Sequence, residues 1–229
     1  MQLKVHGTIL SPWVRRLVLF IEEKELPYEL ETVVPLGEPD PDFLKISPLG
    51  KIPVLEFNGR FLPDSLAACT LIESEVSDPA LFPEQGWDHA WMLWLCDYLA
   101  TAFFSKVEAP LFIQKFVNPN FQNTEPDQAI IDAALAYMPQ VFDYLESLLL
   151  SGQAFLLGDK VSLADLTAGS IFVNFYHAGE QVDAARWPNL SDYVTRLHAR
   201  PSFQRVLERE RKTVGALSPI FAGSPDPVG

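Results

Sequence analysis

Two hydrophobic periods alternate along the first third of the chain. Apolar and polar residues alternate over residues 3–6, which predicts a short strand. Apolar residues then recur at helical spacing over residues 14–21, and Pro12 lies where the first turn of a helix tolerates proline. Alternation returns over Tyr28–Val34 and predicts a second strand.

The clearest local signal is a hairpin. Asn58-Gly59 separates the apolar runs 54–57 and 60–62, and this dipeptide favours a type I′ turn between paired strands. Asp64-Ser65 follows and is expected to cap a helix that ends near Val76. The order strand, helix, strand, hairpin, helix predicts a small mixed sheet with helices packed on it.

The pattern changes after residue 76. Residues 77–86 combine prolines, a glycine and acidic side chains, which indicates a linker. The remainder shows helical spacing without strand-like alternation. We therefore expect a mixed domain over 1–76, a linker over 77–86 and an all-helical domain over 87–229.

Within the second domain, prolines are expected to limit the helices. A helix beginning near Trp87 has the spacing to continue towards Phe116, and Pro110 is expected to kink or break it. A further helix opens after residues 124–127, and Pro139 is expected to kink that one. The first helix carries aromatic side chains on one face: Trp87, Trp91, Trp94 and Tyr98. Such a stripe favours core or subunit interface over a pocket for an apolar ligand.

The end of the chain has one strong capping signal. Ser162 and Asp165 have the spacing of a capping box, which predicts a helix start. Two shorter helices are expected over 188–199 and 202–212. Residues 218–229 contain three prolines and two glycines, so an irregular tail is expected.

Charge and cysteine content narrow the class of protein. The formal net charge is −13 with no block of Lys or Arg, so nucleic acid and anionic membrane surfaces are unfavourable partners. Apolar runs fall short of the ~20 residues of a membrane span, and the N-terminus has no apolar leader. Cys69 and Cys96 form no CxxC motif and are typical of buried residues in a reducing compartment. These features predict a cytoplasmic protein.

Two motifs together carry a family resemblance. Residues 11–16 read Ser-Pro-Trp-Val-Arg-Arg, and residues 47–55 read Ser-Pro-Leu-Gly-Lys-Ile-Pro-Val-Leu, with Asp64-Ser65 after the hairpin. The chain resembles the cytosolic glutathione transferases, with the serine-type motif pattern, as far as about Lys212. The resemblance implies an α/β thioredoxin-like N-terminal domain (βαβ-ββα) followed by an all-α C-terminal helical domain.

The resemblance implies that Ser11 is the catalytic residue. A free thiol has a pKa of about 8.5, and the thiolate is the nucleophile. Backbone N–H groups at a helix start favour negative charge, and the Ser11 hydroxyl would donate a hydrogen bond to the sulfur of glutathione. Arg15 would add supporting positive charge. The alternative for Ser11 is an ordinary helix cap.

Further positions would bind the remaining parts of glutathione. Ile52-Pro53 matches the family's cis-proline, whose preceding residue offers its backbone to the cysteinyl amide; the alternative is an ordinary proline at a strand start. Asp64 would receive the γ-glutamyl ammonium and Ser65 the γ-glutamyl carboxylate, and capping is the alternative for both. Lys51 would contact the glycyl carboxylate. Trp13 would contact the second substrate.

Three departures from the family pattern bear on glutathione affinity. Asp64 stands where Glu or Gln is common, Pro63 precedes it, and the loop over 37–40 is acidic where some members carry Lys. Lys51, and with it Lys45, would have to serve the glycyl carboxylate instead.

Two functional hypotheses follow. The first is an enzyme that conjugates or reduces small hydrophobic electrophiles with glutathione as cosubstrate, with a glutathione-dependent peroxidase side activity and a role in detoxification. The second is a non-catalytic protein of the same fold that binds apolar ligands or a protein partner. The resemblance also implies a homodimer. The four histidines are scattered without ligand spacing, so no metal is expected.

Overall fold

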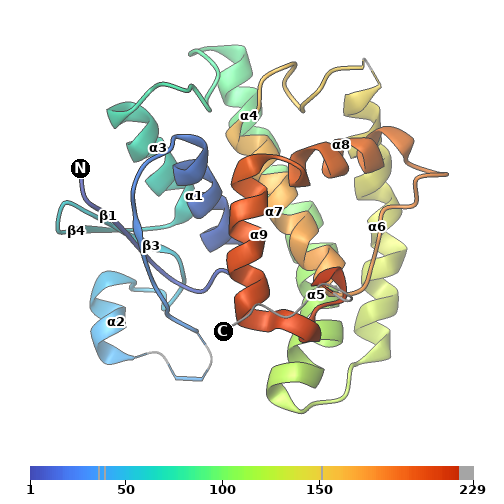
Figure 1. Ribbon diagram of the computed structural model, residues 1–229. Helices are drawn as coiled ribbons and strands as arrows, with labels where there is room; N and C mark the ends of the chain where they lie inside the picture. Colours follow the sequence, from blue (N-terminus) through green and yellow to red (C-terminus); the bar gives the residue numbers. More distant parts are fainter. Residues whose placement is uncertain (36, 39, 151, 222–229) are drawn as a thin grey trace. The chain divides into compact units, whose positions relative to one another are not determined.

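The computed structural model describes residues 1–35, 37–38, 40–150 and 152–221 (Figure 1). The chain divides into two compact units, Met1–Phe82 and Pro83–Gly229. The division falls inside the segment 77–86 that the sequence predicts to be a linker.

The first unit is built around a four-stranded mixed sheet. The strand order is β2-β1-β3-β4, with β1 parallel to β2 and antiparallel to β3, and with β3 antiparallel to β4. Its helices α1 and α3 pack against each other (Figure 1). The elements are β1 (Leu3–His6), α1 (Pro12–Glu23), β2 (Glu29–Glu31), α2 (Pro41–Ile46), β3 (Val54–Phe57), β4 (Arg60–Pro63) and α3 (Ser65–Glu75).

The predicted hairpin is confirmed, and the second strand is shorter than predicted. Asn58 and Gly59 have φ values of 49° and 78°, the positive values that a type I′ turn requires at both central positions. The alternating segment Tyr28–Val34 forms a strand only over Glu29–Glu31. β2 is an edge strand paired with β1 alone, and its pairing ends at His6, where β1 itself ends.

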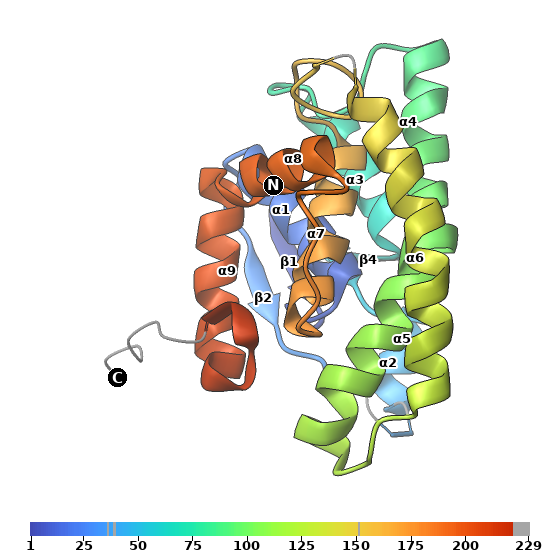
Figure 2. The same cartoon turned by 90° about the vertical axis from the view of Figure 1, so that its right-hand side faces the viewer.

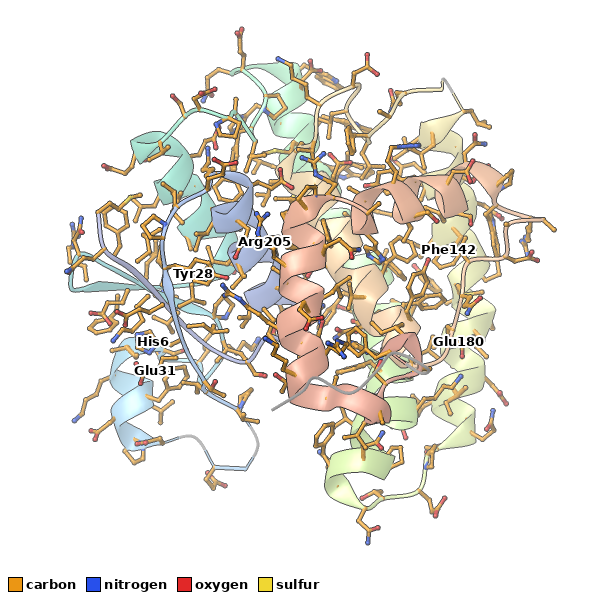
Figure 3. All side chains as sticks on the ribbon, viewed as in Figure 1. His6, Tyr28, Glu31, Phe142, Glu180 and Arg205 are labelled. Atoms are coloured by element: carbon orange, nitrogen blue, oxygen red, sulfur yellow. The ribbon has the colours of Figure 1, made fainter. Side chains whose placement is uncertain are left out.

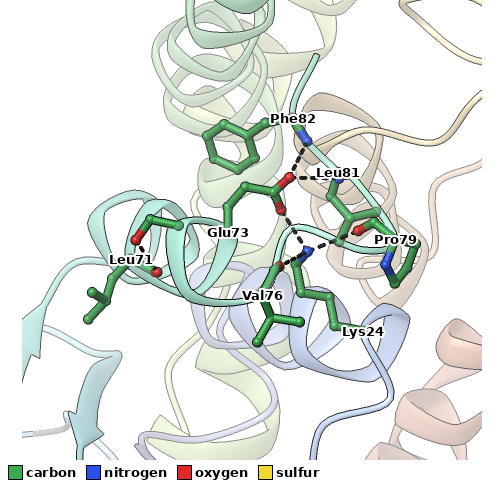
Figure 4. A network of polar contacts seen from close by, with 8 residues as sticks. Lys24, Leu71, Glu73, Val76, Pro79, Leu81 and Phe82 are labelled. Atoms are coloured by element: carbon green, nitrogen blue, oxygen red, sulfur yellow. Dashed lines mark hydrogen bonds and ion pairs between the residues drawn. The ribbon is translucent and has the colours of Figure 1, made fainter. Parts of the chain in front are cut away.

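A buried lysine fixes residues 76–82 to the first unit (Figure 4). The Lys24 ammonium, at the C-terminal cap of α1, donates to the carbonyls of Val76 at 2.6 Å and Pro79 at 2.9 Å. It also pairs with the Glu73 carboxylate at 2.7 Å. The other Glu73 oxygen accepts hydrogen bonds from the backbone N–H groups of residues 81–82. Most of the predicted linker is therefore an ordered part of the first unit.

The second unit is helical in the part that the structure describes. One long helical run and α6 lie side by side (Figure 2), and α7 contacts α4, α5 and α8. The elements are α4 (Trp87–Tyr98), η1 (Leu99–Glu108), α5 (Ala109–Phe112), η2 (Ile113–Gln122), α6 (Gln128–Leu149), α7 (Leu163–His177), α8 (Pro188–His198), α9 (Pro201–Val214), η3 (Gly215–Leu217) and η4 (Pro219–Phe221).

Pro110 does not break the long helix, and the alternative expectation of a kink at this proline stays a prediction. Helical structure continues from Trp87 to Gln122, with π-helical segments η1 and η2 on either side of the single turn α5. Pro110 lies in the first turn of α5, where the ladder changes from π to α hydrogen bonding and a missing N–H is tolerated. Pro139 lies inside α6, which is continuous over 22 residues, and the kink expected there stays a prediction.

Helix α7 and a group of phenylalanines form the core of the second unit. Every residue of α7 except Tyr176 is buried. Ring centroids in the group lie 4.6–6.1 Å apart, with Phe142 labelled in Figure 3. The four rings are those of Phe103, Phe142, Phe172 and Phe175. Aromatic pairs at this spacing add packing energy beyond the area they bury.

The capping box that opens α7 is present. The Asp165 carboxylate accepts hydrogen bonds from the backbone N–H of Ser162 at 2.8 Å and from its hydroxyl at 2.7 Å. The same carboxylate accepts from the Leu156 N–H and the Tyr193 hydroxyl, each at 2.9 Å. Asp165 therefore joins α7 to α8 and to the turn before α7.

The start of the tail is not irregular, contrary to expectation. Ser218 is buried, and its hydroxyl lies 2.5 Å from Nδ1 of His177. The other ring nitrogen of His177 lies 3.2 Å from the Glu210 carboxylate. Pro219–Phe221 then forms a 3₁₀ turn. The rest of the predicted tail, residues 222–229, lies outside the described residues.

Cys69 and Cys96 are buried, and within the described part of the chain neither forms a disulfide. Among the described residues, no helix is long and apolar enough to cross a membrane.

Candidate functional site

Ser11 occupies the N-cap of α1, directly before Pro12. Its Oγ accepts a hydrogen bond from the Val14 backbone N–H at 3.5 Å, the upper limit for such a bond, so the hydroxyl is only weakly engaged. The side chain is half-buried and remains accessible. The partial positive charge of the helix start and a hydroxyl donor therefore occur together at this position.

Gly7 places the start of α1 against Ile52. A Cβ built on Gly7 would lie 2.5 Å from Val14 Cγ2 and 3.3 Å from Ile52 Cβ. The peptide bond between Ile52 and Pro53 is cis, as the family resemblance implies. Gly7 was absent from the predicted site, although a glycine between a strand and a helix is a recognisable signal of close backbone approach.

Asp64 caps helix α3 and is tied to the cis-proline. One carboxylate oxygen accepts hydrogen bonds from Leu66 N–H at 2.7 Å and Ala67 N–H at 3.0 Å. The Asp64 backbone N–H donates to the Pro53 carbonyl at 3.3 Å. Asp64 is exposed, with a φ of 84°. Capping therefore uses one oxygen, and the second makes no hydrogen bond to a described residue.

The Ser65 hydroxyl is held by an arginine of α1. Arg16 donates to Ser65 Oγ from Nε at 3.1 Å and from Nη2 at 2.5 Å. The guanidinium also lies over the Trp13 ring, 4.8 Å from its centroid. Both Arg16 and Ser65 are buried. The sequence prediction missed Arg16 as a site residue, although two consecutive arginines in an apolar helix marked it.

The remaining predicted residues differ in their exposure. Arg15 is fully buried, Lys51 is exposed, and Trp13 is half-buried. Lys45 pairs with the Asp42 carboxylate at 2.6 Å.

Together these contacts link the start of α1, the cis-proline and the start of α3. Arg16 joins α1 to Ser65, Asp64 joins α3 to Pro53, and Gly7 packs between Val14 and Ile52. The elements that carry Ser11, Ile52, Pro53, Asp64 and Ser65 are thus connected within one unit. Among the described residues, no group of three metal-ligating side chains is found.

The charged side chains on the sheet form a separate cluster. His6 Nε2 lies 3.2 Å from the Glu56 carboxylate, and Nδ1 lies 3.7 Å from that of Glu31, which Figure 3 labels beside it. Lys4 pairs with Glu29 at 3.4 Å. The hydrogen bond that the Lys4 ammonium donates to the Glu29 carboxylate raises the pKa of Lys4.

A small mixed sheet with a cis-proline, followed by a helical unit, defines a recognisable class of protein. Residues 10–75 match the N-terminal domain of glutathione S-transferases, and residues 98–201 match their C-terminal domain. The chain therefore belongs to the cytosolic glutathione transferase superfamily, and the predicted fold class is confirmed.

Individual relatives extend over most of the chain. A probable glutathione S-transferase of Oryza sativa subsp. japonica, GSTF2, is 28% identical over 211 residues, covering 89% of this chain and 95% of the relative. Glutathione S-transferase theta-1 of Bos taurus is 28% identical, covering 87% and 83%. The crystal structure of a glutathione S-transferase from Rhodospirillum rubrum F11 has a TM-score of 0.82 at 26% identity, covering 90% and 92%.

Proposed function

We propose that this protein is a glutathione transferase that activates glutathione through Ser11 and conjugates or reduces small hydrophobic electrophiles. The supporting observation is the weakly engaged Ser11 hydroxyl at the N-terminus of α1. A donor at that position favours the thiolate over the thiol, because hydrogen bonding to the charged form lowers a pKa. Ser11 acts as a hydrogen-bond donor, and the sulfur of glutathione is the nucleophile.

The other parts of glutathione are assigned to residues of the same unit. Ile52, preceding cis-Pro53, pairs its backbone with the cysteinyl amide. The unengaged Asp64 oxygen receives the γ-glutamyl ammonium, and the start of α3 at Ser65 receives the γ-glutamyl carboxylate. Lys51 contacts the glycyl carboxylate.

Trp13 and Arg15 have supporting roles in this proposal. Trp13, half-buried two residues after Ser11, contacts the electrophile. Arg15 is fully buried in α1 and adds positive potential through the protein interior, where charges are screened less than in water.

The test is the ultraviolet difference absorbance of bound glutathione as a function of pH, for the wild type and Ser11→Ala. We expect the bound thiol to ionise well below its free pKa of about 8.5 in the wild type and near that value in the variant. A thiol that titrates identically in both proteins would refute the role of Ser11. Activity with a panel of electrophiles and a hydroperoxide then separates conjugation from peroxidase activity.

The second candidate is a non-catalytic protein that binds apolar ligands or a protein partner. Asp64 and the acidic loop favour it, because Asp64 already caps its own helix and Lys45 is engaged with Asp42. Glutathione binding without turnover on every electrophile, together with an unshifted thiol pKa, would support this candidate over the first.

We further propose a cytoplasmic homodimer that acts in detoxification. Trp87 and Trp94 are exposed large aromatic residues, 77% and 42% accessible. They stack with Trp91 and Tyr98 along one face of α4, and an exposed aromatic face is typical of a subunit interface. Sedimentation of the wild type and Trp94→Ala tests this: the variant should dissociate at a higher protein concentration than the wild type. A wild type that sediments as a monomer would exclude the homodimer.

A further inference from the structure

The hydrogen bonds of the Ser65 hydroxyl determine whether it can accept or donate towards a ligand. It accepts two hydrogen bonds from the Arg16 guanidinium, at 3.1 and 2.5 Å. A serine hydroxyl has two acceptor lone pairs and one donor proton, so both acceptor positions are occupied. Towards any further group, Ser65 can act only as a donor. Among the described residues no acceptor takes this proton, although Ser65 is 1% exposed and buried donors normally have a partner.

The arginine that imposes this polarity is itself fixed. Arg16 is 4% exposed, and its guanidinium lies over the Trp13 ring at 4.8 Å. Guanidinium remains protonated at every physiological pH and donates through a rigid planar fork. Trp13 and Ser65 therefore hold a permanent positive charge behind the first residue of α3.

Asp64 and Arg16 place opposite charges near this helix start. Asp64 brings a carboxylate to the same helix start, where it caps Leu66 and Ala67. A ligand carboxylate bound there would be repelled by Asp64, because like charges within a few ångströms disfavour each other's ionised form. The Arg16 guanidinium offsets that repulsion, and the Asp64 oxygen remains available for a cationic group of the ligand.

We propose that Arg16 is a positioning residue that holds the Ser65 hydroxyl as an obligatory hydrogen-bond donor. The start of α3 therefore selects a ligand that carries a carboxylate beside an ammonium. The α-amino acid end of a γ-glutamyl thiol has this arrangement. This inference rests on the proposed glutathione site. It assigns the preference for a charged carboxylate over a neutral carboxamide to Arg16, acting through Ser65, and leaves thiol activation to Ser11.

The experiment compares the dissociation constants of glutathione and of its analogue with a carboxamide in place of the γ-glutamyl α-carboxylate, by calorimetry. A hydrogen bond to a charged group contributes about 1.5–3 kcal/mol, so the wild type should prefer glutathione by roughly ten- to a hundredfold. In Arg16→Met and in Ser65→Ala the preference should fall to about twofold. The double variant should lose no more than Arg16→Met alone, because the two residues act as one unit.

Arg60→Met is the matched control. Arg60 is an exposed residue of β4, and its replacement changes the net charge by the same amount as Arg16→Met. The control should keep the wild-type preference. Arg16→Lys, which keeps the charge without the fork, should restore part of it. When the protein is saturated with glutathione, Arg16→Met should leave the pKa of the bound thiol unchanged. General damage to the site would instead raise that pKa towards the value of free glutathione.

The outcomes separate this inference from the proposed function. If wild type and Arg16→Met prefer glutathione over the carboxamide analogue to the same extent, the proposed role of Arg16 is wrong and the transferase proposal is unaffected. Additive losses in the double variant overturn action through Ser65. A wild type that binds neither thiol overturns both proposals. If Arg16→Met does not fold, Ser65→Ala and Arg16→Lys decide the question in the same assay.

Discussion

Asp165 is the position where a single substitution should have the largest calculable effect on stability. Its carboxylate is completely buried and accepts four hydrogen bonds, two on each oxygen. The donors are two backbone N–H groups, of Leu156 and Ser162, and two hydroxyls, of Ser162 and Tyr193. The hydroxyls can rotate towards other acceptors, but the backbone groups cannot.

The magnitude follows from the donors that lose their acceptor. Asp165→Ala leaves two buried N–H groups unpaired at about 1–3 kcal/mol each, so a loss of roughly 4 kcal/mol in the free energy of unfolding is expected. Asp165→Asn keeps one oxygen and turns an NH₂ group towards the other backbone donor, for a loss of about 2 kcal/mol. Tyr193→Phe removes one hydrogen bond, for about 1 kcal/mol. The exposed Asp159→Asn serves as control and should lie within about 0.5 kcal/mol of wild type.

The assay is urea denaturation followed by far-ultraviolet circular dichroism, with the slope of each transition checked against wild type. The predicted order of loss is Asp165→Ala, then Asp165→Asn, then Tyr193→Phe. An Asp165→Ala protein as stable as the Asp159→Asn control would refute the reasoning, because the four donors would then have found other partners at no cost.

The pH dependence of the free energy of unfolding gives a second test at Asp165. Burial raises the pKa of Asp165 above its ordinary value of 3.8, against the opposing effect of its hydrogen bonds. A raised folded-state pKa contributes stability that is fully present below the unfolded-state pKa and is lost as the pH rises through the folded-state value. Asp165→Asn cannot ionise, so its stability deficit relative to wild type should narrow as the pH rises from 3.8. A deficit that widens over that range would contradict the direction.

Three further predictions concern other parts of the molecule. Lys24→Met removes the cation that joins α1 to residues 76–82 and leaves the Glu73 carboxylate without its cation. A loss of about 3 kcal/mol in the free energy of unfolding is therefore expected in urea denaturation, against less than about 0.5 kcal/mol for the exposed Lys45→Met. Equal stability of the two variants would contradict it. Gly7→Ala brings a Cβ to 2.5 Å from Val14, so calorimetry should show a loss of about 1–3 kcal/mol in stability together with weaker glutathione binding. Burial raises the pKa of Tyr98 to about 12, so the folded state favours the neutral hydroxyl of this residue. The contribution of that hydroxyl to the free energy of unfolding is complete below pH 10 and is lost as the pH rises towards 12. Absorbance titration should therefore show one fewer late-ionising tyrosine in Tyr98→Phe, and an unchanged late step would refute this.

Local signals determined several elements correctly. Asn58-Gly59 fixed the hairpin, Ser11-Pro12 the start of α1, and Ser162 with Asp165 the start of α7. Each of these depends on the backbone preferences of one or two residues, or on hydrogen bonds that span three or four positions. Sequence neighbours alone supply all the atoms involved, so no knowledge of packing was needed.

Contacts between residues far apart in the chain could not be predicted from the sequence. Arg16 and Ser65 are 49 positions apart, and Lys24 reaches carbonyls 52 and 55 positions away. Pro110 was expected to kink or break a helix, and the helix continues through it with π-helical hydrogen bonding in the adjacent segments. These outcomes depend on which side chains packing brings together and on which backbone groups it leaves to be paired.

The candidate site shows the same division. The family resemblance of the sequence grouped Ser11, Ile52-Pro53, Asp64 and Ser65 as a predicted glutathione site, and local signals marked the two helix starts and the X-Pro bond among them. Only the tertiary structure decided how these residues are connected. Gly7 allows α1 to pack close to Ile52, one Asp64 oxygen caps its own helix, and Arg16 leaves Ser65 with only its donor proton for a ligand. The physical reason is that a side chain's hydrogen-bonding role is determined by all of its partners, and those partners come together only when the chain has folded.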